Sequence, residues 1–266
     1  MKGNALISHH YIRRALSLSD KITAQSLLLL LYVCKIGEKN VFDRLHKFWQ
    51  ETGLINNNQF GFLKGRPTVT QLLSSLSDWA KSRNLSCPTD VVFLDLAKAF
   101  DSVPHKRLLL KLKSNGIDGR LNAWLRYFLT GRRQRVILRG TRSNWSRVTS
   151  GTPQGTILGP LLFLTYINDI TNCVSSTVKP YADDTKIYRQ IVDPIKDPQL
   201  LQIDLSNLME WACKWQLRFN EDKHMCITHT RDKSITQYML DKPLKDVKSF
   251  KDLGVTITKD LSCSLL

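Results

Sequence analysis

The chain has 266 residues, of which 42% are hydrophobic, so it is long and apolar enough to fold around a substantial core. Lysine and arginine number 39 against 23 acidic residues, which gives a net charge of +16. This composition excludes a disordered chain, and the charge indicates a polyanionic partner such as nucleic acid, although a basic protein without such a partner explains the charge equally well.

Neither the cysteines nor the longest apolar run points to a metal finger or a membrane anchor. The six cysteines form no CxxC pair and no Cys/His cluster with zinc-finger spacing, which favours free thiols in a reducing, intracellular compartment. The run from Leu27 to Cys34 is too short to span a bilayer and too far from Met1 for an ordinary signal peptide. We therefore expect no membrane partner.

The first third of the chain is predicted to be largely helical. Residues 1–40 have helical character but no motif, and residues 41–50 place four apolar side chains on one helical face. Gly53 and three asparagines then break the helix. The basic loop QFGFLKGRPT leads into a further helix from about Val69 to Lys81.

The middle of the chain alternates a strand, helices and a hairpin. VVFLDL, residues 91–96, is an almost wholly apolar strand that ends in Asp95. A helix is predicted to start near Pro104, with Asp101 as its cap, and residues 121–129 carry an apolar stripe on another helix.

Turn-rich sequence follows. Residues 133–140 and 145–150 are predicted to form a hairpin around a polar turn, and GTPQG, residues 151–155, is a tight loop. An apolar helix is expected from Leu158 to Ile170.

The last third returns to strands around one helix. VKPYADDTKIYR, residues 178–189, is predicted to be a hairpin with two adjacent aspartates at its tip, and Leu201 to Trp215 repeat at helical spacing. MCITHT, QYML and LGVTI are predicted strands. Because helices and strands do not alternate regularly, we expect an α+β fold with helices packed on one face of an antiparallel sheet.

Three carboxylates are the strongest candidates for a reaction centre. Asp183 and Asp184 interrupt a strand-like stretch that otherwise disfavours aspartate, and Asp95 ends an apolar strand. Taken alone, each motif is better explained as a turn or loop residue, but their joint presence in a basic chain favours convergence. Carboxylates that converge repel each other unless a cation lies between them, and Mg²⁺ prefers oxygen ligands of this kind.

Five motifs in order then identify a family resemblance: FLDLAKAFDSVPHKRLLLKL, GTPQGTILGPLLFLTYINDI, KPYADDTKIYR, WQLRFNEDK and FKDLGVTI. From about Val41 to Asp260 the chain resembles the reverse transcriptases of non-LTR (LINE-type) retrotransposons of the jockey and CR1 sort. The resemblance implies an RNA-directed DNA polymerase, which transfers nucleotides from dNTPs to a DNA primer 3′-hydroxyl on an RNA template.

The implied fold is the palm and partial fingers of a right-hand polymerase. The implied domains are an unmatched extension at 1–40, partial fingers at 41–90, the first part of the palm at 91–130, a fingers hairpin at 131–150, and the palm through the primer grip at 151–266.

By this resemblance, Asp95 and Asp183 bind two Mg²⁺ ions, with Mn²⁺ as an alternative. Asp184 is a secondary ligand, and the backbone carbonyl of Leu96 completes one metal shell. Phe100 is implied to be the steric gate that selects deoxynucleotides; without the resemblance it would be a core phenylalanine.

The remaining implied roles concern the nucleotide and the nucleic acid. They assign Gln154 and Gly155 to the incoming nucleotide, Lys223 to its phosphates, Leu253 and Gly254 to the primer grip, and Lys64 and Arg66 to nucleic-acid contacts. Arg132, Arg133 and Arg135 either extend this basic surface or are a solvated charge run.

The sequence also departs from the family pattern. GFLKGRPT stands where the family has GFRKGRST, and an NYRPISL-like fingers motif and the thumb are missing. A truncated, catalytically inactive retroelement remnant that at most binds nucleic acid therefore stays open as the alternative. A viral RNA-dependent RNA polymerase is a third hypothesis, disfavoured by Phe100 and YADD. The family works on chromosomal DNA, which implies the nucleus.

Overall fold

The computed structural model describes residues 24–266 except 57, 64, 221, 230–235, 262 and 266. Two compact units make up the chain. A helical unit contains the residues up to Ile55 together with Lys98–Tyr166, and a sheet unit contains Asn56–Ala97 together with Ile167–Leu266.

The helical unit is built from α2 (Ala24–Thr52), α4 (Ala99–Ser102), α5 (His105–Ser114), α6 (Gly119–Leu129) and most of α7 (Leu158–Ile167). The predicted apolar face of residues 41–50 buries Leu45 and Trp49, and α5 packs against α6. Although α2 has 29 residues, neither it nor any other helix in the described part of the chain is apolar enough over a sufficient length to cross a membrane.

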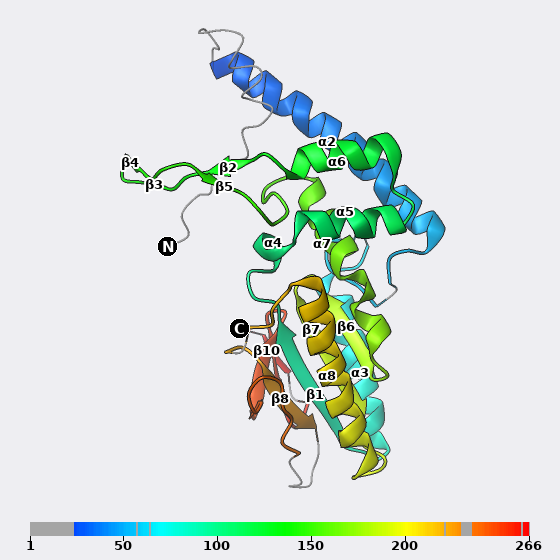
Figure 1. The fold of residues 1–266 in the computed structure, drawn as a ribbon. Helices are drawn as coiled ribbons and strands as arrows, with labels where there is room; N and C mark the ends of the chain where they lie inside the picture. Colours follow the sequence, from blue (N-terminus) through cyan, green and yellow to red (C-terminus); the bar gives the residue numbers. More distant parts are fainter. Residues whose placement is uncertain are drawn as a thin grey trace. The chain divides into compact units, whose positions relative to one another are not determined.

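A two-stranded ribbon belongs to the same unit and confirms that this segment is a hairpin, but its turn lies at residues 139–140 and not at residues 141–144, between the two predicted strands. Its outer ladder pairs β3 (Ile137–Leu138) with β4 (Thr141–Arg142), and its inner ladder pairs β2 (Arg133–Gln134) with β5 (Ser146–Arg147). The connecting residues Arg139 and Gly140 both have positive φ, 48° and 83°, which is the backbone that a two-residue hairpin loop favours. In Figure 1 the ribbon extends from the end of α6.

The sheet unit contains a five-stranded sheet with strand order β6-β7-β1-β8-β9. Its strands are β1 (Thr89–Asp95), β6 (Thr177–Tyr181), β7 (Asp184–Gln190), β8 (Met225–His229) and β9 (Lys245–Asp246). All neighbouring pairs are antiparallel except β8 and β9. A second sheet has the strands β10 (Ser249–Asp252), β11 (Val255–Thr258) and β12 (Cys263–Leu265). The helices of this unit are α3 (Thr68–Asn84), the 3₁₀ helix η1 (Asn168–Cys173) and α8 (Lys196–Trp215).

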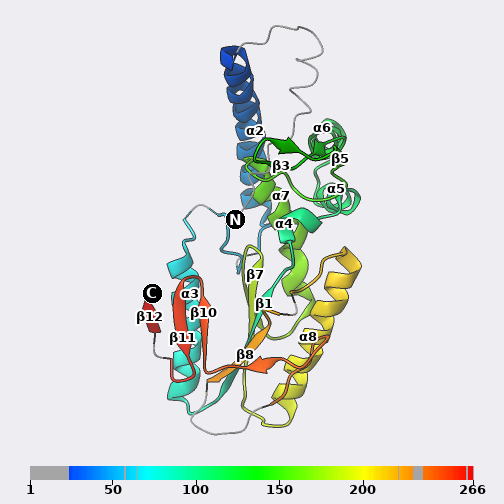
Figure 2. The ribbon, with the colours of Figure 1, turned by 90° about the vertical axis from the view of Figure 1, so that its left-hand side faces the viewer.

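Both faces of the larger sheet are buried. Val91 and Phe93 pack with Trp79 of α3 and with Ile257 of the smaller sheet, whereas α8 packs against β7. Figure 2 shows α3 and α8 on opposite sides of the sheet. The α+β class is confirmed, but the helices cover both faces rather than one, because Val91–Leu94 of β1 are apolar without alternation and six of the seven residues of the strand are buried.

Three local predictions differ from the structure. Asp101 lies inside α4 and does not cap α5, whose N-cap is Pro104 without a side-chain bond; the Asp101 carboxylate instead accepts a hydrogen bond from Gln154. QYML is not a strand, because Met239 forms only an isolated bridge with Pro243. The apolar helix α7 ends at Ile167, three residues earlier than predicted, and continues as η1.

Candidate active site

Two of the three predicted carboxylates lie directly opposite each other. The register of β1 and β7 pairs Asp95 with Asp184 at the open end of both strands. Residues opposed in this way have Cβ atoms about 4.5–5.5 Å apart. Because β1 is buried at six of its seven residues and β7 at the four residues that follow Asp184, the sheet core fixes the position of this pair.

The third carboxylate, Asp183, belongs to the turn between β6 and β7. Ala182 begins this turn with a φ of 56°, a left-handed conformation that costs a non-glycine residue about 1–3 kcal/mol and persists only where its surroundings hold it. The buried Gln59 provides such a restraint, since its Oε1 accepts hydrogen bonds from the backbone N–H groups of Ala182 (3.2 Å) and Gly61 (2.8 Å).

Gly61 lies against the same turn. A Cβ atom at this position would be 2.3 Å from the backbone nitrogen of Ala182, so only glycine fits. The neighbouring N–H of Phe60 donates to the carbonyl of Pro180 at 3.3 Å. Sequence analysis missed this role of Gln59 and Gly61, because no local pattern connects their loop with the hairpin.

Burial and neighbouring carboxylates raise the pKa values of Asp183 and Asp184. Burial, followed by the negative charges of Asp183, Asp95 and Asp252, raises the pKa of Asp184 to about 6. Burial and then the charge of Asp95 raise the pKa of Asp183, while Lys223 partly offsets both shifts. The site therefore holds more negative charge than its own cations balance.

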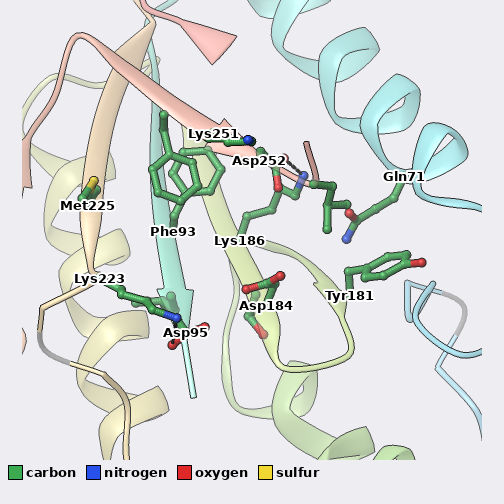
Figure 3. Close-up of a pocket in the computed structure, with 14 residues that line it drawn as sticks. Gln71, Phe93, Asp95, Tyr181, Asp184, Lys186, Lys223, Met225, Lys251 and Asp252 are labelled. Carbon is green, nitrogen blue, oxygen red and sulfur yellow. Dashed lines mark hydrogen bonds and ion pairs between the residues drawn. The ribbon is translucent and has the colours of Figure 1, made fainter. Parts of the chain in front are cut away.

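Lys223 is the nearest cation. Its Nζ lies 3.0 Å from Oδ2 of Asp95, and this hydrogen bond and the charge of Asp95 raise the pKa of Lys223. The Asn220 amide also donates to Asp95 Oδ2 at 3.3 Å, and the Asn220 backbone N–H donates to the Asp95 carbonyl. An isolated bridge between Leu96 and Phe219 continues β1 beyond Asp95. Figure 3 shows Lys223 and Asp95 together, with Asp184 on the adjacent strand.

A cavity of about 230 Å³ opens beside these groups. Asp95, Asp184 and Lys223 line it together with Leu253, the predicted primer-grip residue. Gly254, its neighbour, has a φ of 90° in the turn between β10 and β11. A buried ion pair between Lys186 and Asp252, which sequence analysis did not anticipate, also lines the cavity (Figure 3).

The donor set fits a hard divalent cation. Its ligands are carboxylate oxygens, and their mutual repulsion is the kind of charge that Mg²⁺ neutralises. Within the residues that the structure describes, however, no three His, Cys, Asp or Glu side chains converge closely enough to form a complete metal centre. A cation held here would therefore need ligands beyond the protein side chains, such as water or phosphate.

Of the predicted nucleotide-binding residues, Phe100, Gln154 and Gly155 belong to the helical unit, whereas Lys223 belongs to the sheet unit. Phe100 is half-buried and stacks on Phe163 with ring centroids 4.5 Å apart. The GTPQG loop packs against Phe100 and Asp101, since a Cβ on Gly151 would lie 2.9 Å from their backbone atoms. Gln154 donates to Asp101 at 3.0 Å.

A second cavity, of about 400 Å³, lies at this loop. Lys98, Asp101 and Gln154 line it, and Gly155 follows as an exposed residue with a φ of 76°.

The predicted basic residues have different surroundings. Lys64 lies outside the described residues. Arg66 is half-buried, and its guanidinium donates to the backbone carbonyl of Gln59 at 2.7 Å. Arg132 is buried and donates to the carbonyls of Leu129 and Gly151, so it braces the GTPQG loop and is not part of a solvated patch.

The sequence of the chain also matches a known protein family. The family model for reverse transcriptase (RNA-dependent DNA polymerase) matches residues 25–257. The chain belongs to the reverse transcriptase family. Its relatives confirm the resemblance to non-LTR retrotransposons.

Two relatives of this reverse transcriptase are similar over most of the chain. The probable RNA-directed DNA polymerase from transposon X-element of Drosophila melanogaster is 29% identical, over 89% of the chain and 27% of the relative. The RNA-directed DNA polymerase from mobile element jockey of Drosophila funebris is also 29% identical, over 88% of the chain and 26% of the relative. The chain thus spans about a quarter of the length of these curated relatives.

Solved telomerase structures share the fold of this chain. Apo telomerase from Candida tropicalis, truncated from the C-terminal domain, gives a TM-score of 0.62 at 11% identity, over 94% of this chain and 50% of that one. The C. tropicalis telomerase in complex with a TWJ fragment of telomeric RNA gives 0.63 at 9% identity, over 96% and 41%. At such identities the likeness establishes the palm and fingers fold alone.

Proposed function

We propose that this reverse transcriptase is an RNA-directed DNA polymerase core that extends the 3′-hydroxyl of a DNA primer with dNTPs on an RNA template. The observation that carries the proposal is the pairing of Asp95 with Asp184, beside the half-buried Asp183, at the end of two buried strands. Reactive groups held on rigid strands keep their geometry better than groups on loops.

We assign Asp95, Asp183 and Asp184, together with the carbonyl of Leu96, as the groups that would hold two Mg²⁺ or Mn²⁺ ions. Such ions, when bound, neutralise phosphate charge and lower the pKa of a hydroxyl nucleophile. The contribution of the chain itself is to keep three like charges together. The β1–β7 register and the hydrogen bonds of Gln59 to the turn support that role.

Lys223 would stabilise negative charge rather than donate a proton. Its pKa is raised by Asp95, so the ammonium group stays protonated near neutral pH and is a poor acid there. Its place beside the cavity suits contact with the phosphates of the nucleotide and with the leaving pyrophosphate.

The other assignments follow the family motifs. Phe100, stacked on Phe163, would exclude the 2′-hydroxyl of a ribonucleotide, while Gln154 and Gly155 would contact the incoming nucleotide and the template base. Leu253 and Gly254 would position the primer end. Lys64 and Arg66 would contact nucleic acid through phosphates.

Primer extension tests this proposal. With Mg²⁺, dNTPs and a labelled DNA primer on an RNA template, Asp183→Asn should lower the extension rate by about 10³-fold or more, because metal ions contribute several kcal/mol of transition-state stabilisation. Asp241→Asn removes an exposed aspartate elsewhere and should leave the rate unchanged. Equal rates for wild type and Asp183→Asn would reject the assigned mechanism.

A second candidate function is nucleic-acid binding without catalysis. Two observations favour it: no complete cluster of ligating side chains forms among the described residues, and the ammonium of Lys223 already pairs with Asp95. Salt-dependent RNA binding without extension at any Mg²⁺ or Mn²⁺ concentration would support this candidate. Failure to bind RNA or DNA at low salt would reject it.

A further inference from the structure

Half of the net positive charge of the chain comes from one stretch. Residues 119–168 contain eight arginines and no aspartate, glutamate or lysine, so they contribute +8 of the total +16. Five of these arginines lie on the two-stranded ribbon, residues 133–147, which we call the arginine ribbon. They are Arg133, Arg135, Arg139, Arg142 and Arg147.

The side chains of the arginine ribbon are mostly open to solvent. Four of its arginines are exposed, and Arg135 is half-buried because its guanidinium lies 4.5 Å from the centre of the Trp145 ring. Large apolar side chains are also exposed, including Leu138 at 71%, Val136 at 67% and Trp145 at 46%. These residues bury little surface in the fold, so core packing does not explain their composition.

The base of the arginine ribbon borders a polar cavity. Arg133, Arg147 and Gln134 line the cavity of about 400 Å³ together with the GTPQG loop. Its one acidic lining residue, Asp101, already accepts a hydrogen bond from Gln154. Positive charge therefore continues from the end of the ribbon to a cavity that can hold anionic groups.

We propose that the arginine ribbon binds a single-stranded nucleic acid. Guanidinium groups match phosphate oxygens in two-point contacts, and this suits arginine better than lysine. Trp145 and its apolar neighbours would contact unpaired bases, because stacking on an aromatic ring tolerates any base. This inference rests on the proposed function only where it calls the bound nucleic acid a template or a primer. Binding of that nucleic acid does not require catalysis.

An anionic membrane surface is the other partner that a basic and apolar hairpin attracts. The structure favours nucleic acid, because arginines occupy the base of the ribbon as well as its turn and two of them line a polar cavity. The apolar side chains are interrupted by Arg139 at the turn, and so they do not form an uninterrupted apolar tip.

The first test is binding of fluorescently labelled oligonucleotides to the full chain, followed by anisotropy. A variant with all five ribbon arginines changed to glutamine should bind single-stranded RNA about tenfold or more weakly at moderate salt, and its slope of log affinity against log salt should fall by about 3. The matched control changes five lysines on other elements to glutamine: Lys81, Lys106, Lys196, Lys214 and Lys248. It should lose less than about threefold.

A loss in the control equal to that in the ribbon variant would overturn the proposal, because binding would then follow net charge alone. Thermal melting of both variants checks that the fold is intact, and the exposed positions predict little change. Anionic phospholipid vesicles are the third arm. Vesicle binding that depends on the ribbon arginines, with RNA affinity unchanged, would overturn the proposal in favour of a membrane.

The variant Trp145→Leu keeps all five ribbon arginines and tests whether the ribbon binds unpaired bases. The affinity for single-stranded RNA or DNA should fall about fivefold or more, while that for an RNA–DNA hybrid stays unchanged. An equal loss of affinity for single-stranded nucleic acid and for the RNA–DNA hybrid would overturn the proposal that the ribbon binds single strands. Preference for RNA identifies the template and preference for DNA the primer, and both support the ribbon. If the wild type fails to extend a primer but these losses occur, the proposed function fails and this inference stands.

Discussion

At the scale of single residues, the pKa of Asp184 reflects burial and the negative charges of the neighbouring carboxylates. Its pKa is raised from 3.8 to about 6, so the folded chain binds a proton there more tightly than the unfolded chain does. Stability from this group is therefore greatest at low pH and is lost as the pH rises from about 4 to 6. Because solvent still reaches part of the Asp184 side chain and screens its charge, the expected penalty at neutral pH is about 1 kcal/mol.

Asp184→Asn should relieve this repulsion. In buffer without divalent ions, its free energy of unfolding should exceed that of the wild type by about 1 kcal/mol at pH 7 and match it at pH 4. Urea unfolding at both pH values measures the difference, with Asp241→Asn as the exposed control. The same stability for Asp184→Asn and wild type at pH 7 would contradict the crowding of charges.

At the scale of secondary-structure elements, the buried pair Lys186–Asp252 connects two functional strands. Lys186 lies on β7, two residues after Asp184, and Asp252 ends β10 immediately before Leu253. Their side chains are only 3% and 6% exposed. Burial lowers the pKa of Lys186, and the charge of Asp252 opposes that shift, so each charge depends on the other.

Lys186→Met should destabilise the chain by about 3–5 kcal/mol, because it leaves the Asp252 carboxylate buried without its cation. The double variant Lys186→Met/Asp252→Leu should recover most of that loss, since an apolar pair needs no desolvated charge. Lys259→Met breaks the more exposed pair with Asp246 and should cost about 1 kcal/mol or less. Urea denaturation of the four proteins, wild type included, compares them. A double variant as unstable as Lys186→Met would contradict this account.

At the scale of the whole molecule, the chain passes repeatedly between its two units. Asp95 belongs to the sheet unit, whereas Phe100, five residues later, belongs to the helical unit. The groups proposed to hold metal ions and those proposed to select the nucleotide are thus carried by different units. A ligand of the carboxylates should stabilise the sheet unit specifically.

Hydrogen exchange can observe this selectivity. Mg²⁺ at about ten times its dissociation constant should stabilise the bound state by about 1.4 kcal/mol and slow amide exchange in β1, β6 and β7. Exchange in α5 and α6 should not change. The variant Asp95→Asn/Asp184→Asn should lose the protection. Equal protection of both units, or none in the wild type, would count against a metal at the carboxylates.

Much of the fold could be predicted because its determinants are local. The apolar run ending at Asp95 predicted the buried strand β1, and Gly53 predicted the end of α2. The hairpin of residues 133–150 followed from alternating residues around a turn. The prediction of a single covered sheet face was wrong, although the uninterrupted apolar residues Val91–Leu94 favour burial on both faces, because a strand with one solvent-exposed face usually alternates apolar and polar residues.

Other parts of the site could not be predicted, because they depend on contacts between distant residues. Gln59 contacts the turn that carries Asp183 across 123 positions, and Lys186 contacts Asp252 across 66. Asp101 was predicted to cap a helix because it lies just before Pro104 in the sequence. In the structure it lies within the short helix α4 and accepts a hydrogen bond from Gln154. Periodicity describes neighbours along the chain and carries no information about such pairs.

Gly61 has no side chain, yet it constrains the turn that carries Asp183. The space that a methyl group would need there is already filled by the backbone of Ala182, the residue before Asp183. Conservation of carboxylates alone would therefore be a poor guide to which related copies can still work. A copy that kept all three aspartates but gained any side chain at position 61 would have to move the very loop that presents them.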